Sequence, residues 1–358
     1  MKTASRSVGS TALDRNRASA HRDVAVWLLV CCFMVAVMVL LGGLTRLTHS
    51  GLSMVEWEPI IGIIPPISDA DWLPFFEKYK LTPEYIKVNA GMTLVEFKGI
   101  FWLEYIHRVW GRAIGLVFLL PFLWLAFSGR IGKGLIPRMI GLFLLGASQG
   151  GMGWFMVKSG LVDNPAVSHI RLTIHLGLAF LIHGWMFWMA LDILADHRPR
   201  PARLEEQGRR AVGRWLVLLT VLVVTTLLFG GLVAGLKAGL IYNTWPLMEG
   251  RLIPSDLFST GILDLFEDIK TVQFTHRGLA ELTVLVAILG WFRGRRLLGG
   301  ATLPAVNAVV GMAVLQVLLG IGTLIFVVPV WLASAHQMGA MALLTLCLWA
   351  IHDVKRRV

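Results

Sequence analysis

The stretch Glu104-Tyr105-Ile106-His107-Arg108 opens the second long apolar run of a 358-residue chain. Its glutamate and histidine are three residues apart, so both would project from one face of a helix. A related stretch, Gln273-Phe274-Thr275-His276-Arg277, opens a later apolar run, with glutamine in place of the glutamate. The repeat predicts a duplicated helical fold, and the one difference predicts that the two copies do different work.

The composition around these stretches is that of a membrane protein. Hydrophobic residues make up 56% of the chain, and the mean hydropathy is +0.69. Apolar runs of about 20 residues have the length that an α-helix needs to cross ~30 Å of hydrocarbon, and a helix satisfies its own backbone hydrogen bonds there. We predict an all-α, polytopic membrane protein with eight transmembrane helices, at residues 25–44, 106–127, 136–156, 170–192, 212–234, 272–292, 303–326 and 330–352.

The net charge of +11 lies in short segments between the predicted spans, which argues against a nucleic-acid-binding protein. The intervening outer segments, 45–105 and 235–271, are long and comparatively acidic. The positive-inside rule therefore places both termini in the cytoplasm. We expect a multi-pass protein of a bacterial inner (plasma) membrane, in contact with the lipid bilayer. The basic segments are residues 1–24, 128–138, 193–211, 293–296 and 353–358.

Internal similarity divides the chain into two halves of four spans each. We predict an N-terminal half at 25–192 and a C-terminal half at 212–352, joined by a cytoplasmic linker at 193–211 and flanked by cytoplasmic tails at 1–24 and 353–358. Copies with four spans each share one orientation, so they should form two pseudo-symmetric four-helix bundles around an axis along the membrane normal. The matched positions are Gly42-Gly43-Leu44 with Gly230-Gly231-Leu232 (188 residues apart), His107 with His276 (169), Gly151-Met152-Gly153 with Gly320-Ile321-Gly322 (169) and His175 with His336 (161).

The four repeated histidines indicate haem. His107, His175, His276 and His336 lie near the outer ends of the even-numbered spans, so all four share one depth. Two imidazoles facing each other across a four-helix bundle form the usual axial pair of a b-type haem. A hydrogen-bonded interior role would explain any one of them, but four at matched depth favour iron ligands. Zinc takes three or four protein ligands, and each half offers only two.

Charged residues near these histidines have candidate roles. Arg108 and Arg277 directly follow two of the histidines, and could bind haem propionates in a bidentate manner or extend to the membrane interface. Arg112 and Glu281 occupy equivalent positions in the two halves, and we expect them to form a pair across the junction. The neighbouring glycines allow either close helix packing or room for a porphyrin.

Glu104 is the residue by which the halves differ most clearly. A carboxylate in a membrane span is costly unless it has a partner or a function; solvation at the interface is the simpler alternative. In a site of low dielectric constant, a carboxylate can stabilise positive charge or accept a proton. We therefore predict a permanent electron carrier in the C-terminal half, which has Gln273, and chemistry in the N-terminal half.

Together these features resemble the haem A synthase family. The resemblance covers nearly all of residues 25–352 and rests on EYIHR (104–108), THRG (275–278), GGLTRLTHSGLSMVEWEP (42–59), the eight spans and the four histidines. It implies that the protein oxidises the C8 methyl group of haem O to a formyl group, giving haem A for cytochrome c oxidase. The chain lacks the outer-loop cysteine pair of some bacterial members, so it is most similar to the proteobacterial and mitochondrial type.

The resemblance also implies the ligands. It places haem b on His276 and His336, and haem O or haem A, the substrate and product, on His107 and His175. It makes Glu104 a functional residue. The expected enzyme is an oxidoreductase that hydroxylates the haem methyl group successively, through an alcohol and a gem-diol that loses water.

Partners and alternatives follow from the same comparison. We expect haem O as substrate, association with haem O synthase and with cytochrome c oxidase assembly, and an electron-transfer partner; a homo-oligomer stays open. One alternative is a dihaem b-type electron-transfer protein, although such haems usually lie at two depths. Another is a haem transporter or chaperone, which would not depend on Glu104.

Overall fold

The computed structural model is all-helical and describes residues 12–56, 64–161, 167–195, 206–297 and 303–356. Eight helices of the described chain are long and apolar enough to cross a membrane, which confirms the predicted number. Each overlaps one predicted span. They are α1 (Ala12–Leu47), α4 (Leu94–Phe127), α5 (Ile136–Gly160), α6 (His169–Ala195), α7 (Glu206–Gly235), α9 (Ile269–Leu297), α10 (Leu303–Ile325) and α11 (Val330–Arg356). The start of the N-terminal tail, most of the 193–211 linker and Trp57-Glu58-Pro59 lie outside the described residues.

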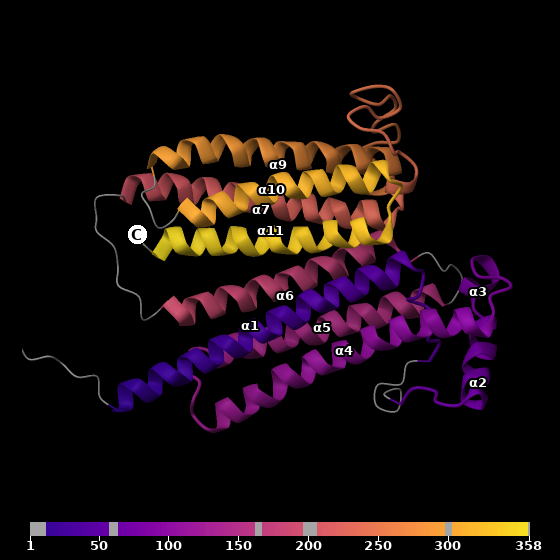
Figure 1. Cartoon of the computed structure of the whole chain (residues 1–358), viewed down its shortest axis with the longest axis horizontal. Helices are drawn as coiled ribbons and strands as arrows, with labels where there is room; N and C mark the ends of the chain where they lie inside the picture. The colour runs from indigo at the N-terminus through magenta and orange to yellow at the C-terminus, as the bar shows by residue number, and fades with distance from the viewer. Residues whose placement is uncertain (1–11, 57–63, 162–166, 196–205, 298–302, 357–358) are drawn as a thin grey trace, which may run out of the picture.

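The membrane helices form two groups that lie side by side (Figure 1). One group contains α1, α4, α5 and α6, and the other contains α7, α9, α10 and α11. Between the groups, α1 packs on α11 and α6 packs on both α7 and α11. The pairing of α1 with α11 and of α6 with α7 is reciprocal, as a two-fold relation between the halves requires. Division at the linker and pseudo-symmetry remain predictions that this arrangement supports.

Polar contacts tie the two groups together at several levels. The side chain of Gln337 on α11 donates to the backbone carbonyl of Val39 on α1, at 2.8 Å. The imidazole of His183 on α6 lies 2.9 Å from the hydroxyl of Thr345 on α11. At the outer end, the guanidinium of Arg46 on α1 donates to the last carbonyls of α7, where a helix concentrates negative potential. We name these contacts between the groups the central seam.

The first outer segment contains α2 (Asp69–Lys80) and α3 (Pro83–Lys87), and it leads into α4. The predicted start of the second span, residue 106, is wrong, because α4 begins at Leu94. Thr93 and Glu96 form a capping box there: the Thr93 side chain accepts from the Glu96 amide, and the Glu96 carboxylate accepts from the Thr93 amide. Such a box supplies partners for amides that a helix start leaves unpaired. As a result Glu104 lies inside a helix, and not at its mouth.

An aromatic cluster fixes this outer segment on α4. Trp72, Phe76 and Tyr79 of α2 pack on Phe97 and Phe101 of α4, with ring centroids 4.9 to 6.4 Å apart. Buried aromatic pairs of this kind contribute about 0.5–1.5 kcal/mol each beyond the area that they bury. The cluster, which also includes Met54, therefore seats α2 over the outer end of α4. The second outer segment has shorter helices, η3 (Ala238–Leu240) and α8 (Asp264–Glu267).

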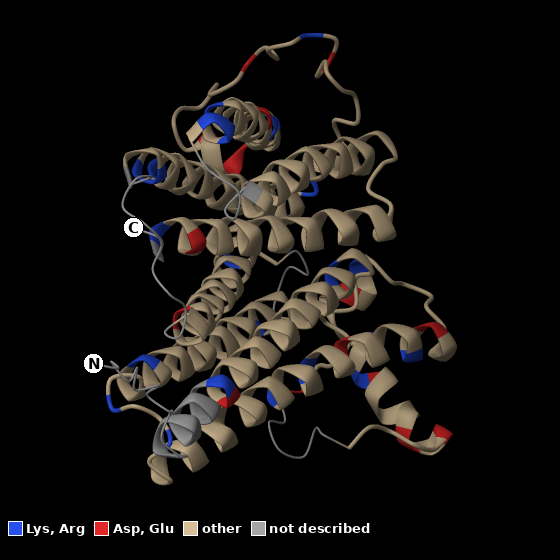
Figure 2. Cartoon of the chain, turned by 60° about the vertical axis from the view of Figure 1, so that its left-hand side comes forward, with Lys and Arg blue, Asp and Glu red and all other residues tan. Residues whose placement is uncertain are grey.

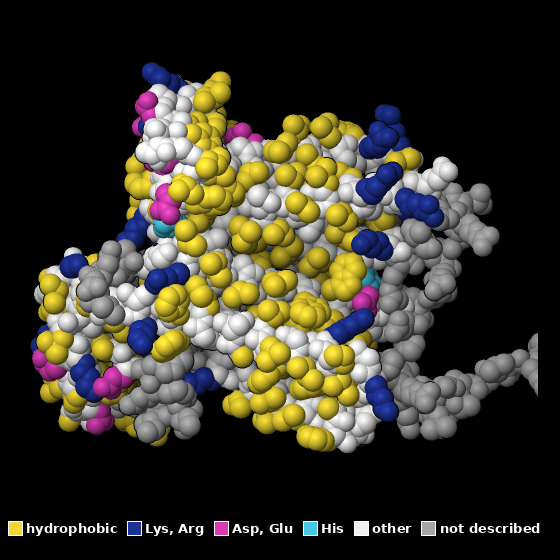
Figure 3. Space-filling model, turned by 180° about the vertical axis from the view of Figure 1, so that it is seen from behind, with side chains coloured by type: hydrophobic (Ala, Val, Ile, Leu, Met, Phe, Trp, Pro, Cys, Tyr) yellow, Lys and Arg dark blue, Asp and Glu magenta, His cyan; other side chains and the backbone are white. Residues whose placement is uncertain are grey.

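Charge and apolar surface are distributed as in a membrane-spanning bundle. Apolar side chains cover the middle of the face shown in Figure 3, while Lys and Arg gather at the end that carries the C-terminus. The opposite end, with α2 and α3, carries both signs of charge (Figure 2). This asymmetry supports the prediction that both termini face the cytoplasm.

Candidate functional site

Each half brings one pair of the predicted histidines together. His107 on α4 and His175 on α6 lie close enough to interact electrostatically, and so do His276 on α9 and His336 on α11. The side chains are partly buried inside their groups of helices. The structure thus produces two separate pairs, one per half, as the repeat predicted.

A glycine on a neighbouring helix faces each of these imidazoles. A methyl group added at any of the four glycines would come into tight contact with the ring, so the glycines keep space beside it. The contacts are Gly42 with His107 (3.3 Å), Gly153 with His175 (3.2 Å), Gly230 with His276 (3.2 Å) and Gly320 with His336 (2.9 Å). One predicted match is corrected: the counterpart of Gly320 is Gly153, and not Gly151, because these two face the equivalent histidines.

The hydrogen bonding of His276 suits iron ligation. Nδ1 of His276 lies 3.0 Å from the carbonyl of Thr226; a carbonyl only accepts, so Nδ1 carries the hydrogen and Nε2 is left as a ligand. In His175 and His336, Nδ1 is buried without a hydrogen-bond partner in the described part of the chain. Among the described residues, no three His, Cys, Asp or Glu side chains are grouped to hold a metal ion. The space and the donor set therefore fit an axial histidine pair in each half.

Filling the space beside His336 should displace haem from the C-terminal half. Gly320→Ala places a methyl group 2.9 Å from Cε1 of His336, and overpacking of this kind typically costs about 1–3 kcal/mol. We expect about a tenfold loss of haem b retention, measured as haem absorbance per purified protein. Gly311→Ala on the same helix is the matched control, because its methyl group meets open space. Equal haem content in both variants would contradict this role for Gly320.

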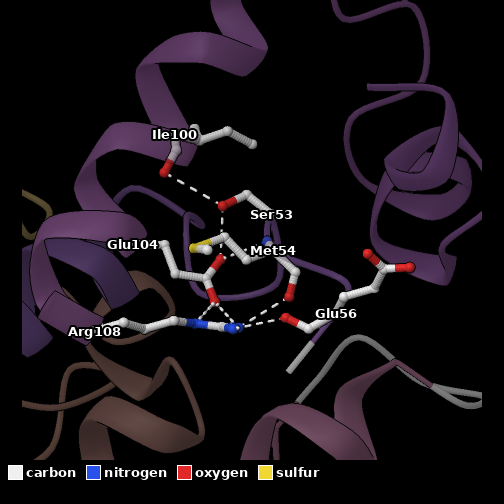
Figure 4. Close-up of polar contacts among 6 residues, drawn as sticks. All are labelled: Ser53, Met54, Glu56, Ile100, Glu104 and Arg108. Carbon is white, nitrogen blue, oxygen red and sulfur yellow. Dashed lines mark hydrogen bonds and ion pairs between the residues drawn. The ribbon is translucent and has the colours of Figure 1, made fainter. Parts of the chain in front are cut away.

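The Glu104 carboxylate is held in a closed set of hydrogen bonds (Figure 4). Its side chain is 2% exposed. Oε2 accepts from the Ser53 hydroxyl at 2.6 Å and from the Met54 amide at 2.9 Å. Oε1 accepts from Nε and Nη2 of Arg108, at 3.0 and 2.5 Å. Four donors use all the acceptor positions of a carboxylate, so Glu104 is not solvated at the interface but is part of a buried ion pair.

Arg108 also fastens the outer segment. Its Nη2 donates to the carbonyl of Met54 at 2.9 Å, and its Nη1 donates to the carbonyl of Glu56 at 3.2 Å. One guanidinium thus joins the carboxylate of α4 to the chain that follows α1. We name Glu104 and the three residues that donate to its carboxylate, Ser53, Met54 and Arg108, the carboxylate cage.

The C-terminal half repeats the arginine but not the cage. Arg277 donates to the carbonyls of Tyr242 and Thr244, at 2.9 and 2.7 Å, which are the counterparts of Met54 and Glu56 at the 188-residue spacing. Gln273 donates to the carbonyl of Tyr242 at 3.0 Å. The same fastening therefore occurs in both halves, and at the position of Gln273 the N-terminal half has a buried carboxylate instead of an amide.

The two arginines predicted to bind propionates differ in how many of their N–H donors are already used within the protein. Arg108 directs its Nε and both terminal nitrogens at Glu104 and the outer segment. In Arg277, Nε is buried without a partner among the described residues. A buried unpaired donor is costly, so Arg277 retains a donor for an anionic group, and propionate binding remains a proposal for both.

The predicted pair of Arg112 with Glu281 is wrong. Arg112 lies on α4 and Glu281 on α9, and these helices are at opposite edges of the molecule (Figure 1). Glu281 is exposed, and it interacts electrostatically with Arg277, one turn earlier on α9. Equivalent positions related by an axis between the halves need not meet at that axis.

Ser53 is the site residue that the sequence analysis missed. It is 2% exposed and lies in the stretch 42–59, which begins with the residues Gly42-Gly43-Leu44 that were matched between the halves at a spacing of 188. Its counterpart at that spacing is Ile241. A comparison of the halves position by position would have shown a hydroxyl opposite an apolar side chain, alongside Glu104 opposite Gln273.

Comparisons with known proteins agree on one family. A family model described as cytochrome oxidase assembly protein matches residues 25–348. A haem A synthase of Paramagnetospirillum magneticum is 74% identical over 358 residues, all of both chains. A haem A synthase of Nitrosospira multiformis is 48% identical over 95% of both chains. A haem A synthase of Rhodospirillum centenum is 47% identical over 97% of this chain and 92% of its own length. The chain therefore belongs to the haem A synthase family of cytochrome oxidase assembly proteins.

Proposed function

We propose that the two halves have different tasks in the haem A synthase reaction. Membership of the family gives this multi-pass oxidoreductase that activity. The N-terminal half binds haem O on His107 and His175, and there the C8 methyl group is converted to a formyl group. The C-terminal half keeps a resident haem b on His276 and His336. Haem b, when bound, supplies one-electron redox chemistry.

The carboxylate cage is the observation that supports this assignment. Both halves have a histidine pair, facing glycines and an arginine that fastens the outer segment, so both can hold a haem. At the position that Gln273 occupies in the C-terminal half, the N-terminal half has a buried carboxylate, Glu104. Chemistry on a substrate calls for a group that can stabilise charge or transfer a proton, whereas an electron carrier does not.

The protein residues have separable tasks in this scheme. His107 and His175 orient the substrate, and the glycines facing them leave room for its ring. Glu104 carries negative charge beside the substrate pocket, in a region of low dielectric constant where charge acts strongly. Two successive hydroxylations of the methyl carbon would give a gem-diol, which loses water to form the formyl group. Each hydroxylation removes two electrons, which would pass to an external electron acceptor, with the haem b of the C-terminal half as the one-electron carrier.

The same proposal includes the cellular setting. The charge asymmetry of the bundle supports an inner-membrane protein with cytoplasmic termini. Haem O is then received from haem O synthase, and haem A is passed to cytochrome c oxidase assembly. Both histidine pairs lie toward the outer ends of their helices, so the electron-transfer partner meets this protein from the outer side.

Extraction of the pigments from purified protein tests the division. We expect two porphyrins by mass: haem b, and haem O or haem A, each near one per protein. His107→Ala should remove the second porphyrin and leave haem b. Protein that contains haem b alone would favour the dihaem electron-transfer alternative and overturn the assignment of the N-terminal half.

A further inference from the structure

The hydroxyl of Ser53 contacts the one carboxylate that distinguishes the two halves. Its oxygen lies 2.6 Å from Oε2 of Glu104, a short distance typical of a hydroxyl donating to an ionised carboxylate. Ser53 and Glu104 are both 2% exposed, so water cannot replace this donor without rearrangement. Among the described residues, the one other acceptor of this hydroxyl is the Ile100 carbonyl, at a longer 3.4 Å.

The bond matters because the two carboxylate oxygens accept from different donors. Arg108 binds Oε1 through two nitrogens, while Ser53 and the Met54 amide bind Oε2. Loss of the hydroxyl leaves Oε2 with a single donor, the Met54 amide, and so removes one of the two bonds that oppose rotation of the carboxylate about its last bond toward the arginine. The C-terminal half has Ile241 at this position and no carboxylate to orient.

We propose that Ser53 is a positioning residue for the oxidation of haem O, acting by holding Oε2 of Glu104 in one orientation. The inference rests on the proposed role of Glu104 in the N-terminal pocket. It identifies a group outside the membrane helices on which the rate should depend.

Ser53→Ala tests the proposal in the full-length holoprotein. A hydrogen bond to a charged group typically contributes enough for about a tenfold change, so we expect about a tenfold slower formation of haem A. Haem b content should stay at the wild-type level. Ser53→Thr keeps the hydroxyl and should recover most of the rate. Ser50→Ala is the matched control: Ser50 is a buried serine of the same segment, but its hydroxyl bonds Thr48 and not Glu104.

Two further measurements separate positioning from a structural role. Infrared spectra of protein with isotope-labelled glutamate should show a shifted carboxylate band in Ser53→Ala and not in Ser50→Ala. In a Glu104→Gln background, Ser53→Ala should cause no further loss, because residues that act through one group are not additive. If Ser53→Ala forms haem A at the wild-type rate, or matches Ser50→Ala in rate and spectrum, the proposal for Ser53 is wrong. Wild-type haem A in Glu104→Gln would instead overturn the proposed function.

Discussion

Glu104→Gln leaves haem b in place and lowers haem A formation by about 100-fold or more, the range of losses seen when a group that transfers protons or stabilises developing charge is removed. The substitution installs in the N-terminal half the side chain that the C-terminal half has at Gln273. Shape and helix packing are conserved, whereas the negative charge of the carboxylate cage is lost. The expected phenotype is therefore a protein with two haem sites and no product.

The measurement is the ratio of haem O to haem A in the purified protein, with haem b as the internal standard for folding. Glu84→Gln is a suitable control. Glu84 is a buried glutamate like Glu104, 4% exposed, but it lies in the outer segment, on α3. Burial raises the pKa of Glu84, so a neutral side chain there relieves a desolvation cost and should not disturb the fold. Undiminished haem A in Glu104→Gln would show that the carboxylate has no part in the reaction.

The histidine pairs should lose their haems independently. His276→Ala and His336→Ala are expected to abolish haem b binding, because a b-type haem depends on both axial ligands. His107→Ala and His175→Ala should leave haem b at the wild-type level and remove haem O and haem A. Haem content by mass in each purified variant gives the result directly.

A buried histidine outside the pairs provides the control for that series. His183 lies on α6, as His175 does, but its ring nitrogens contact Thr345 and the carbonyl of Cys32. His183→Asn should therefore keep both haems and alter only the stability of the central seam. Loss of both haems from each of the four single variants would show that the two sites are not separate.

Most of the fold could be predicted from periodicity and length. Apolar runs of the right length identified eight spans, and the spacing of the histidines identified which helices would bring them together. The start of α4 was missed because its first turns contain polar residues, so hydropathy does not extend to Leu94. The signal there is the capping box of Thr93 and Glu96, which is local chemistry and not composition.

Side-chain contacts across the molecule were harder to predict. The pairing of Arg112 with Glu281 assumed that equivalent residues lie near the axis between the halves, but α4 and α9 lie farthest from it. The partner of Glu104 turned out to be Arg108, one turn away on the same helix, an arrangement that i,i+4 spacing allows but does not require. Ser53 needed the path of the outer segment, which only tertiary packing determines.

Under the proposed division of labour, the central seam has a consequence for how electrons would pass between the two sites. Its contacts join α1 to α11 and α6 to α11 through backbone carbonyls and buried side chains, so one half cannot rock against the other without breaking them. A carrier that alternates its access would need such rocking. A seam that stays shut instead gives the two histidine pairs a constant separation, and therefore a tunnelling distance that does not change from one turnover to the next.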